Sequence, residues 1–141
     1  MNINYSLDTI EHAAEQLLRA KKDVIVFCFD AEMGAGKTTF IKALASAIGA
    51  NKETFSSPTF GIVNEYKTEN KLLFHYDFYR LQTAEELFNI GFEDYLNTPN
   101  AIHFIEWPGV AYPFLKNYLL INFKIESNNE RTLIIEDKIV E

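Results

Sequence analysis

A glycine-rich stretch between two apolar segments constrains this chain more strongly than any other feature. It reads AEMGAGKTTF over residues 31–40. The preceding run VIVFCF (24–29) is short, continuous and apolar, which is typical of a strand buried on both faces. The following run KTTFIKALASAI (37–48) has apolar residues at helical spacing and ends before Gly49, a common helix C-cap. The sequence therefore predicts a strand, a sharp turn and a helix in direct succession.

The residues of this turn are those that a phosphate-binding loop requires. Such a loop aims backbone N–H groups inward and leads into a helix whose positive dipole end faces the anion. Gly34 and Gly36 permit the conformation. Lys37 supplies a positive charge for the terminal phosphates, Thr38 supplies a hydroxyl for Mg²⁺, and Thr39 lies where it can contact an inner phosphate.

The loop departs from the pattern G-x-x-x-x-G-K-[ST] at its first position, where Ala31 replaces glycine. That position contributes turn geometry and not a phosphate ligand, so alanine fits if its φ is negative. The alternative interpretation is a glycine turn without a ligand. The strand predicted before the loop and the helix predicted after it favour the phosphate site.

The remaining elements alternate between strands and helices. A capping box at Asp8 and Glu11 predicts a first helix, and another at Thr83 and Glu86 predicts a short helix through Ile90. Strands are predicted over 61–67, 71–79, 101–107, 118–126 and 131–137. We expect a single P-loop ATPase domain over residues 1–141, an α/β three-layer P-loop NTPase-like fold with a mostly parallel central sheet and antiparallel additions.

Composition limits the classes of function. The formal net charge of −7 argues against a protein that grips a nucleic-acid backbone, so any contact with nucleic acid is expected to be indirect. The N-terminus lacks the basic start and apolar run of a signal peptide, and no run approaches the roughly 20 apolar residues that span a bilayer. We therefore expect a cytoplasmic protein without a membrane segment.

Two acidic residues are candidates for a second magnesium ligand. Mg²⁺ takes most of its oxygen ligands from phosphates and water, so the protein need supply only one or two. Glu106 ends the apolar run AIHFIEW, and Asp77 lies within LLFHYDFY. We favour Glu106 as the metal ligand, because ligands bind at the carboxyl ends of parallel strands. Asp77 then orients water, the alternative being an ion pair with Arg80.

Four separated blocks resemble the bacterial TsaE family, formerly YjeE. They are GAGKTTF (34–40), SPTF (57–60), HYDFYR (75–80) and EWP (106–108), and they occur in the family's order and at similar separations. The resemblance extends over nearly the whole chain. Four blocks together are far more specific than the glycine-rich loop alone.

The resemblance implies a small ATPase that uses ATP and Mg²⁺ and acts with the TsaB and TsaD proteins. Their joint product is the threonylcarbamoyl modification of the adenosine beside the anticodon of certain tRNAs, with tRNA contacted only through the complex. It also implies catalytic roles for Lys37, Asp77, Glu106 and Thr59, magnesium binding by Thr38 and Glu106, and nucleotide binding by Gly34, Ala35, Gly36, Lys37, Thr38, Thr39 and Arg131.

Other functions of a phosphate loop remain open at this point. A small P-loop kinase usually grips a second anionic substrate with several arginines, and this chain has only Arg19, Arg80 and Arg131. A nucleotide-gated binding module uses hydrolysis only as a reset. A guanine-nucleotide switch requires N-K-x-D, whose final aspartate is missing from NKET (51–54) and NKLL (70–73). We expect ATP hydrolysis that is slow without the partner proteins.

Overall fold

The computed structural model describes residues 1–50 and 62–139 of the chain. The strands are β1 (Asn2–Ser6), β2 (Val26–Asp30), β3 (Val63–Lys67), β4 (Leu72–Asp77), β5 (Ala101–Glu106), β6 (Asn117–Ser127) and β7 (Glu130–Ile139). The helices are α1 (Ile10–Ala20), α2 (Lys37–Ile48), α3 (Ala84–Asn89) and α4 (Phe92–Leu96), with 3₁₀ turns η1 (Leu7–Thr9) and η2 (Pro108–Phe114).

These strands form one sheet of seven in the order β1-β7-β6-β2-β5-β4-β3. Strand β2 lies between β5 and β6 and runs parallel to both, and β4 runs parallel to β5. The outer strands β3, β7 and β1 pair antiparallel with their neighbours. The expected mostly parallel sheet with antiparallel additions is therefore confirmed.

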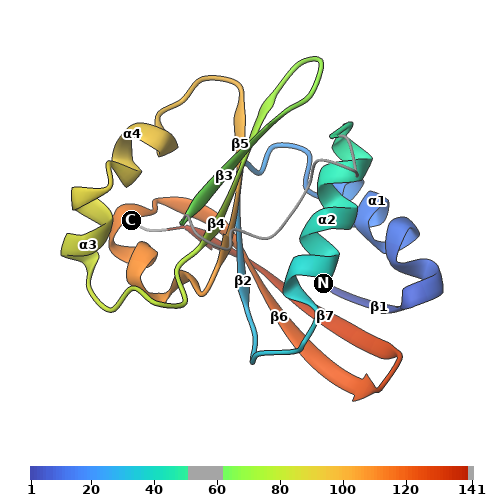
Figure 1. Cartoon of the computed structure of the whole chain (residues 1–141). Coiled ribbons are helices and arrows are strands. Elements are labelled where there is room, and N and C mark those ends of the chain that lie inside the picture. The colour runs from blue at the N-terminus through green and yellow to red at the C-terminus, as the bar shows by residue number, and fades with distance from the viewer. Residues whose placement is uncertain (51–61, 140–141) are drawn as a thin grey trace.

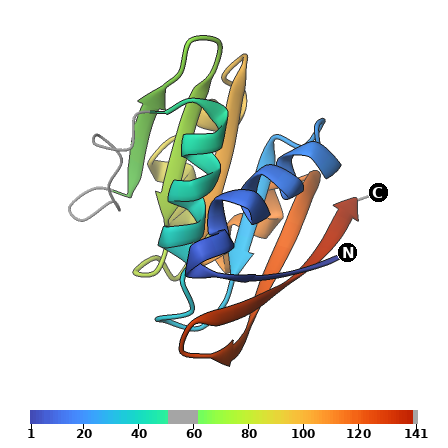
Figure 2. The same ribbon diagram turned by 90° about the vertical axis from the view of Figure 1, so that its right-hand side faces the viewer.

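Helices cover both faces of the sheet, which confirms the three layers (Figures 1 and 2). Helices α1 and α2 pack on one face, where Leu17 and Phe40 join the buried core. Helices α3 and α4 and the turn η2 pack on the other, where Leu87 and Phe92 are fully buried. Each face therefore has its own apolar core, and β2 is buried between them.

Most predicted boundaries agree with the structure within a few residues. Helix α2 spans 37–48 as expected, and Gly49 ends it with a φ of 119°. Strand β2 begins at Val26, two residues later than the apolar run. The Thr83 capping box is present at the start of α3. Four elements lack a sequence prediction: β1, η1, α4 and η2.

Strand β1 is absent from the predictions because it has little local signal. Only Ile3 and Tyr5 of its five residues are buried, and its pairing partner β7 lies at the other end of the chain. Within the described residues, no helix is long and apolar enough to cross a membrane.

Candidate functional site

The loop between β2 and α2 has the backbone conformation that its glycines suggested. Gly34 and Gly36 have φ angles of 83° and 102°, in the left-handed region that disfavours side chains. The non-glycine residues with positive φ in the described chain are Asn100 and Trp107, so Ala31 has the negative φ that an alanine needs there. No side chain caps the N-terminus of α2, and no acidic residue lies in its first turn. This helix end therefore suits an anion.

Lys37 is held beside the loop by two kinds of contact. Its Nζ donates to the carbonyl oxygen of Ala31 at 2.5 Å and lies 3.5 Å from that of Glu32. The same ammonium lies 3.5 Å from the centroid of the Trp107 ring, a cation–π contact. Burial lowers the pKa of Lys37, and the carboxylates of Glu106, Asp77 and Asp30 oppose that shift.

Thr38 of α2 and Glu106 of β5, the two predicted magnesium ligands, contact each other. Glu106 is the last residue of β5 and pairs in register with Phe29 of the adjacent β2. The Thr38 hydroxyl lies 3.0 and 3.1 Å from the two carboxylate oxygens of Glu106. Glu106 is only 3% exposed, and His75 Nε2 lies 2.5 Å from its Oε2. A hydroxyl and a carboxylate therefore converge beside the loop.

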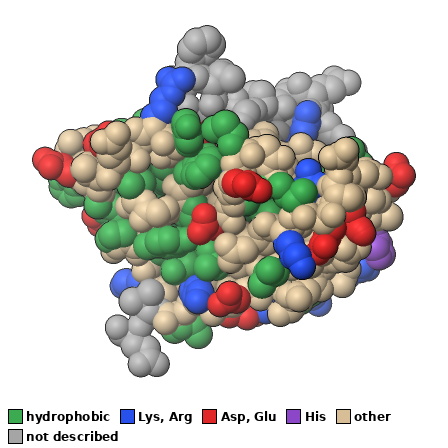
Figure 3. Space-filling model, turned by 90° about the horizontal axis from the view of Figure 1, so that it is seen from below, with side chains coloured by type: hydrophobic (Ala, Val, Ile, Leu, Met, Phe, Trp, Pro, Cys, Tyr) green, Lys and Arg blue, Asp and Glu red, His purple; other side chains and the backbone are tan. Residues whose placement is uncertain are grey.

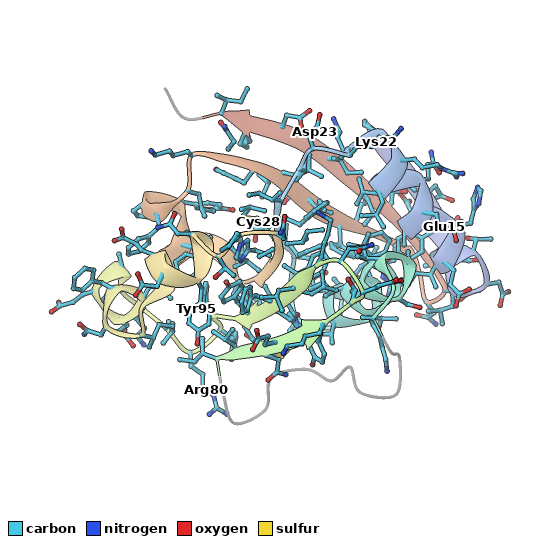
Figure 4. The ribbon with its side chains drawn as sticks, turned by 90° about the horizontal axis from the view of Figure 1, so that it is seen from above. Glu15, Lys22, Asp23, Cys28, Arg80 and Tyr95 are labelled. Atoms are coloured by element: carbon cyan, nitrogen blue, oxygen red, sulfur yellow. The ribbon has the colours of Figure 1, made fainter. Side chains whose placement is uncertain are left out.

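Asp77 lies one strand further from the loop than Glu106. It is the last residue of β4 and pairs in register with Glu106. Its carboxylate accepts a hydrogen bond from the backbone N–H of Tyr79 at 3.0 Å. Asp77 and Arg80 are both described and form no ion pair with each other, and Arg80 points outward at the edge of the molecule (Figure 4). Asp77 is therefore available to the space beside the loop.

A cavity of about 370 Å³ joins these groups. Its lining consists of loop, helix and strand-end residues: Met33, Gly34, Gly36, Lys37, Thr38, Thr39, Asp77, Glu106 and Trp107. Figure 3 shows this end of the molecule, with acidic and basic side chains interspersed among apolar ones. The cavity combines a cation, two hydroxyls and two carboxylates at the carboxyl ends of parallel strands.

Arg131 lies on the opposite side of the loop. Its Nε donates to the carbonyl oxygen of Ala35 at 2.9 Å, and its Nη1 donates to the carbonyl oxygens of Ser127 and Glu130. The guanidinium thus ties the loop to the β6–β7 hairpin. Arg131 also lines a second cavity of about 200 Å³, which shares Gly34, Gly36 and Thr39 with the first and is further lined by Tyr5, Leu7, Ile10, Ala35, Asn128 and Asn129.

The structure thus brings together most of the residues that the sequence singled out. Thr59 lies outside the described residues. The sequence reasoning missed the contact of His75 with Glu106. A signal was present, because His75 stands two residues before Asp77 and alternate residues of a strand share a face. The sequence does not show that β5 is the neighbour of β4, and this pairing is what brings Glu106 beside His75 and Asp77.

Comparisons with known proteins show which family this chain resembles. The family model described as threonylcarbamoyl adenosine biosynthesis protein TsaE matches residues 5–133. The tRNA threonylcarbamoyladenosine biosynthesis protein TsaE of Rickettsia typhi is 34% identical over 112 residues, covering 79% of this chain and 76% of that protein. The protein of the same name from Haemophilus influenzae is 39% identical over 90 residues, covering 64% of this chain and 55% of that protein.

A solved structure shares the fold over almost the entire chain. YdiB of Bacillus subtilis superposes with a TM-score of 0.68 and 22% sequence identity. The match covers 99% of this chain and 87% of that one. The same fold therefore occurs in a protein whose sequence has diverged considerably.

Proposed function

This chain belongs to the TsaE family of threonylcarbamoyl adenosine biosynthesis proteins, and from that premise we propose that it is a Mg²⁺-dependent ATPase working in the cytoplasm with TsaB and TsaD. One observation carries the ATPase proposal. Lys37, Thr38 and Glu106 come from a helix start and a strand end and converge on one cavity beside a glycine loop.

The chemistry of this cavity suits the triphosphate of ATP. The uncapped start of α2 offers backbone N–H groups to oxygens of the phosphates, and the left-handed glycines leave the approach open. A side-chain Cβ added at Gly34 or Gly36 would meet no atom within 4 Å, so there is space beside the backbone of the loop. Lys37 would hold the terminal phosphates, for which its ammonium would leave the carbonyl oxygen of Ala31.

Magnesium fits the donors beside the loop. Thr38 and Glu106 are both oxygen donors, which Mg²⁺ prefers. Among the described residues, no group of three or more His, Cys, Asp or Glu side chains is arranged as a metal site, so this metal would depend on phosphate and water oxygens for its remaining ligands. When bound, Mg²⁺ neutralises phosphate charge. Asp77 lines the same cavity and would orient the attacking water.

The second cavity suits the nucleoside end of the same ligand. It shares the loop and Thr39 with the phosphate cavity and lies on the other side of them. Leu7 and Ile10 supply apolar surface there, and Asn128 and Asn129 supply amides that can hydrogen-bond a base. A nucleotide that crosses the loop from one cavity to the other would use both.

Partner proteins supply the remaining parts of the proposed reaction. In this chain Arg131 is engaged by backbone carbonyls, and Arg80 points outward. Phosphoryl transfer is often accelerated by an added arginine that stabilises charge. We therefore propose slow hydrolysis by the chain alone and faster hydrolysis with TsaB and TsaD. The net charge of −7 is consistent with tRNA being handled by the complex.

Two substitutions test the proposal and separate binding from hydrolysis. Lys37→Ala should weaken ATP binding on the order of 10- to 100-fold, because a charged hydrogen bond contributes roughly 1.5–3 kcal/mol. Glu106→Ala should retain ATP binding and lose most hydrolysis. Calorimetric titration measures binding, and phosphate release with and without TsaB and TsaD measures turnover.

Lys42→Ala and Glu136→Gln are the matched controls, because both side chains are exposed and lie outside the two cavities. If the folded protein does not bind ATP with Mg²⁺, even in the presence of its partners, the proposal is contradicted. Turnover of about ten per second or faster by the chain alone, unchanged by TsaB and TsaD, contradicts the dependence on partners. A Glu106→Ala protein that binds ATP and its partners, but does not return from the ATP-bound conformation through hydrolysis, favours a nucleotide-gated module.

A further inference from the structure

We propose that His75 is a positioning residue for the magnesium site, which it serves by donating a hydrogen bond to the carboxylate of Glu106. This inference rests on the proposed function. It assigns a role to a buried side chain that lies behind the cavity and does not line it.

The strand pairing of the sheet places His75 behind Glu106. Strands β4 and β5 are parallel neighbours, in which His75 pairs with Phe104 and Asp77 pairs with Glu106. Side chains two residues apart lie on the same face of a strand. Phe104 packs in the core under α1 and α2, so His75 and Glu106 both lie on the face that carries the loop helix.

The contacts define the direction of the hydrogen bond. His75 is fully buried, and its Nε2 lies 2.5 Å from Glu106 Oε2. An ionised carboxylate accepts hydrogen bonds and cannot donate them, so with Glu106 in the ionised form that a metal ligand requires, His75 Nε2 carries the proton. The Thr38 hydroxyl bonds the same carboxylate from the loop side. Glu106 is therefore held between a strand and a helix.

The hydrogen bond from His75 to Glu106 resembles those that support the ligands in known metal sites. Ligating carboxylates are usually hydrogen-bonded by a second residue, and loss of that partner typically costs 10- to 100-fold in metal affinity or activity. Glu106 needs such a partner because a buried carboxylate without one is poorly stabilised. Thr38 must turn its hydroxyl toward a bound metal, and then His75 remains as the partner that orients the carboxylate.

The other histidines are not placed for this role. His103 lies on the opposite face of β5, where its Nδ1 is 2.7 Å from the Tyr76 hydroxyl. His12 is exposed on α1 and lies outside both cavities. His12→Gln is therefore a suitable control for substitutions at His75.

A matched pair of variants tests the proposal. His75→Gln keeps an N–H donor that reaches Glu106, whereas His75→Met has a similar size and no donor. Calorimetry would measure ATP binding in EDTA and in increasing Mg²⁺, and electron paramagnetic resonance would measure Mn²⁺ binding to the ATP complex. We expect His75→Met to need about 10- to 100-fold more metal and His75→Gln to stay within about threefold of the wild type. ATP binding in EDTA should be unchanged in both.

The outcomes separate this inference from the proposed function. A wild-type protein that binds no ATP in either condition contradicts the proposed function. If the wild type binds ATP with Mg²⁺ and His75→Met shows the same metal dependence, only the role of His75 is overturned. Equal losses in ATP binding with and without metal, for both variants, indicate a purely structural residue and overturn it as well.

A measurement on the wild type covers the case in which His75→Met does not fold. Nitrogen-15 NMR of the imidazole rings identifies which ring nitrogen of His75 carries a proton. We expect a protonated Nε2 whose signal shifts when Mg²⁺ is added to the ATP complex, while the signals of His12 stay in place. An unprotonated Nε2, or a signal that ignores the metal, overturns the proposal.

Discussion

Trp107 is the residue whose backbone departs furthest from ordinary geometry near the site. Its φ of 57° is unusual for a bulky side chain, and such conformations cost on the order of 1–3 kcal/mol. It lies between Glu106 at the end of β5 and Pro108 at the start of η2. This conformation places its ring beneath the ammonium of Lys37 and 5.0 Å from the ring of Tyr79.

This contact makes Trp107 a reporter of ligand binding. It is the only tryptophan in the chain, so its fluorescence comes from one site. A phosphate that draws the Lys37 ammonium away from the ring should change the emission of Trp107, because a nearby charge alters its surroundings. Stopped-flow fluorescence would measure the change on adding ATP and Mg²⁺. The amplitude should saturate at the calorimetric stoichiometry in both wild type and Lys42→Ala. Emission that stays constant while calorimetry detects binding contradicts the expected movement of Lys37.

At the scale of elements, the phosphate loop depends on a hairpin that is remote in sequence. Arg131 of β7 donates to Ala35 in the loop and to Ser127 and Glu130 in the hairpin. Arg131 also pairs in register with Tyr5 of β1, whose pKa is raised to about 12 by burial, an effect that the Arg131 charge opposes. The resemblance implied a nucleotide contact for Arg131. That contact stays a prediction, whereas its hydrogen bonds tie the loop to the hairpin.

Loss of this bridge should loosen the loop. We expect Arg131→Met to weaken ATP binding roughly tenfold. A hydrogen bond to a charged group contributes about 1.5–3 kcal/mol, and without it part of that free energy would be spent on ordering the loop when ATP binds. Hydrogen exchange should increase over residues 31–36. Arg19→Met is the control, since Arg19 is exposed on α1. Unchanged exchange in the loop of Arg131→Met would show that the hairpin does not hold it.

At the scale of the whole molecule, stability depends on a histidine in the second core. His103 is fully buried under α3 and α4, stacks on Phe74 and lies 2.7 Å from the Tyr76 hydroxyl. Burial lowers the pKa of His103 to about 4. The folded protein therefore favours neutral His103, whereas the unfolded chain takes up a proton near pH 6.5.

The sign of the pH effect follows from this difference. The stability contributed by neutral His103 is complete above about pH 6.5 and decreases as the pH falls toward about 4, where the folded state also takes the proton. The full difference amounts to roughly 3 kcal/mol. Urea unfolding at pH 7, 5.5 and 4.5 would measure it. In His103→Gln the decrease over this range should be smaller by most of that amount. An equal decrease in wild type and His103→Gln would contradict the role of His103.

The local pattern of the chain was sufficient to predict a glycine turn between a strand and a helix, which the structure confirms. Its strand, glycines, Lys37 and helix are contiguous, so short-range periodicity and backbone preference determine them together. Glu106 was also identifiable, because it ends an apolar run and thus marks the carboxyl end of a buried strand. Glu106 ends β5, which adjoins β2, whereas Asp77 ends β4, which does not, and the choice of Glu106 as the metal ligand stays a prediction.

Tertiary structure alone decided how separate segments meet. The sequence contains no local signal that β6 returns beside β2 or that β1 pairs with β7. The two-residue spacing puts His75 on the face of Asp77, but only the pairing of β4 with β5 brings Glu106 beside it. Each of these depends on pairing between strands far apart in the chain, which is set by the global packing of two cores. The sequence by itself therefore determined which chemical groups the site contains. The sheet determined which of them are in contact, because hydrogen-bond register is set between neighbouring strands and cannot be read from the residues of one strand.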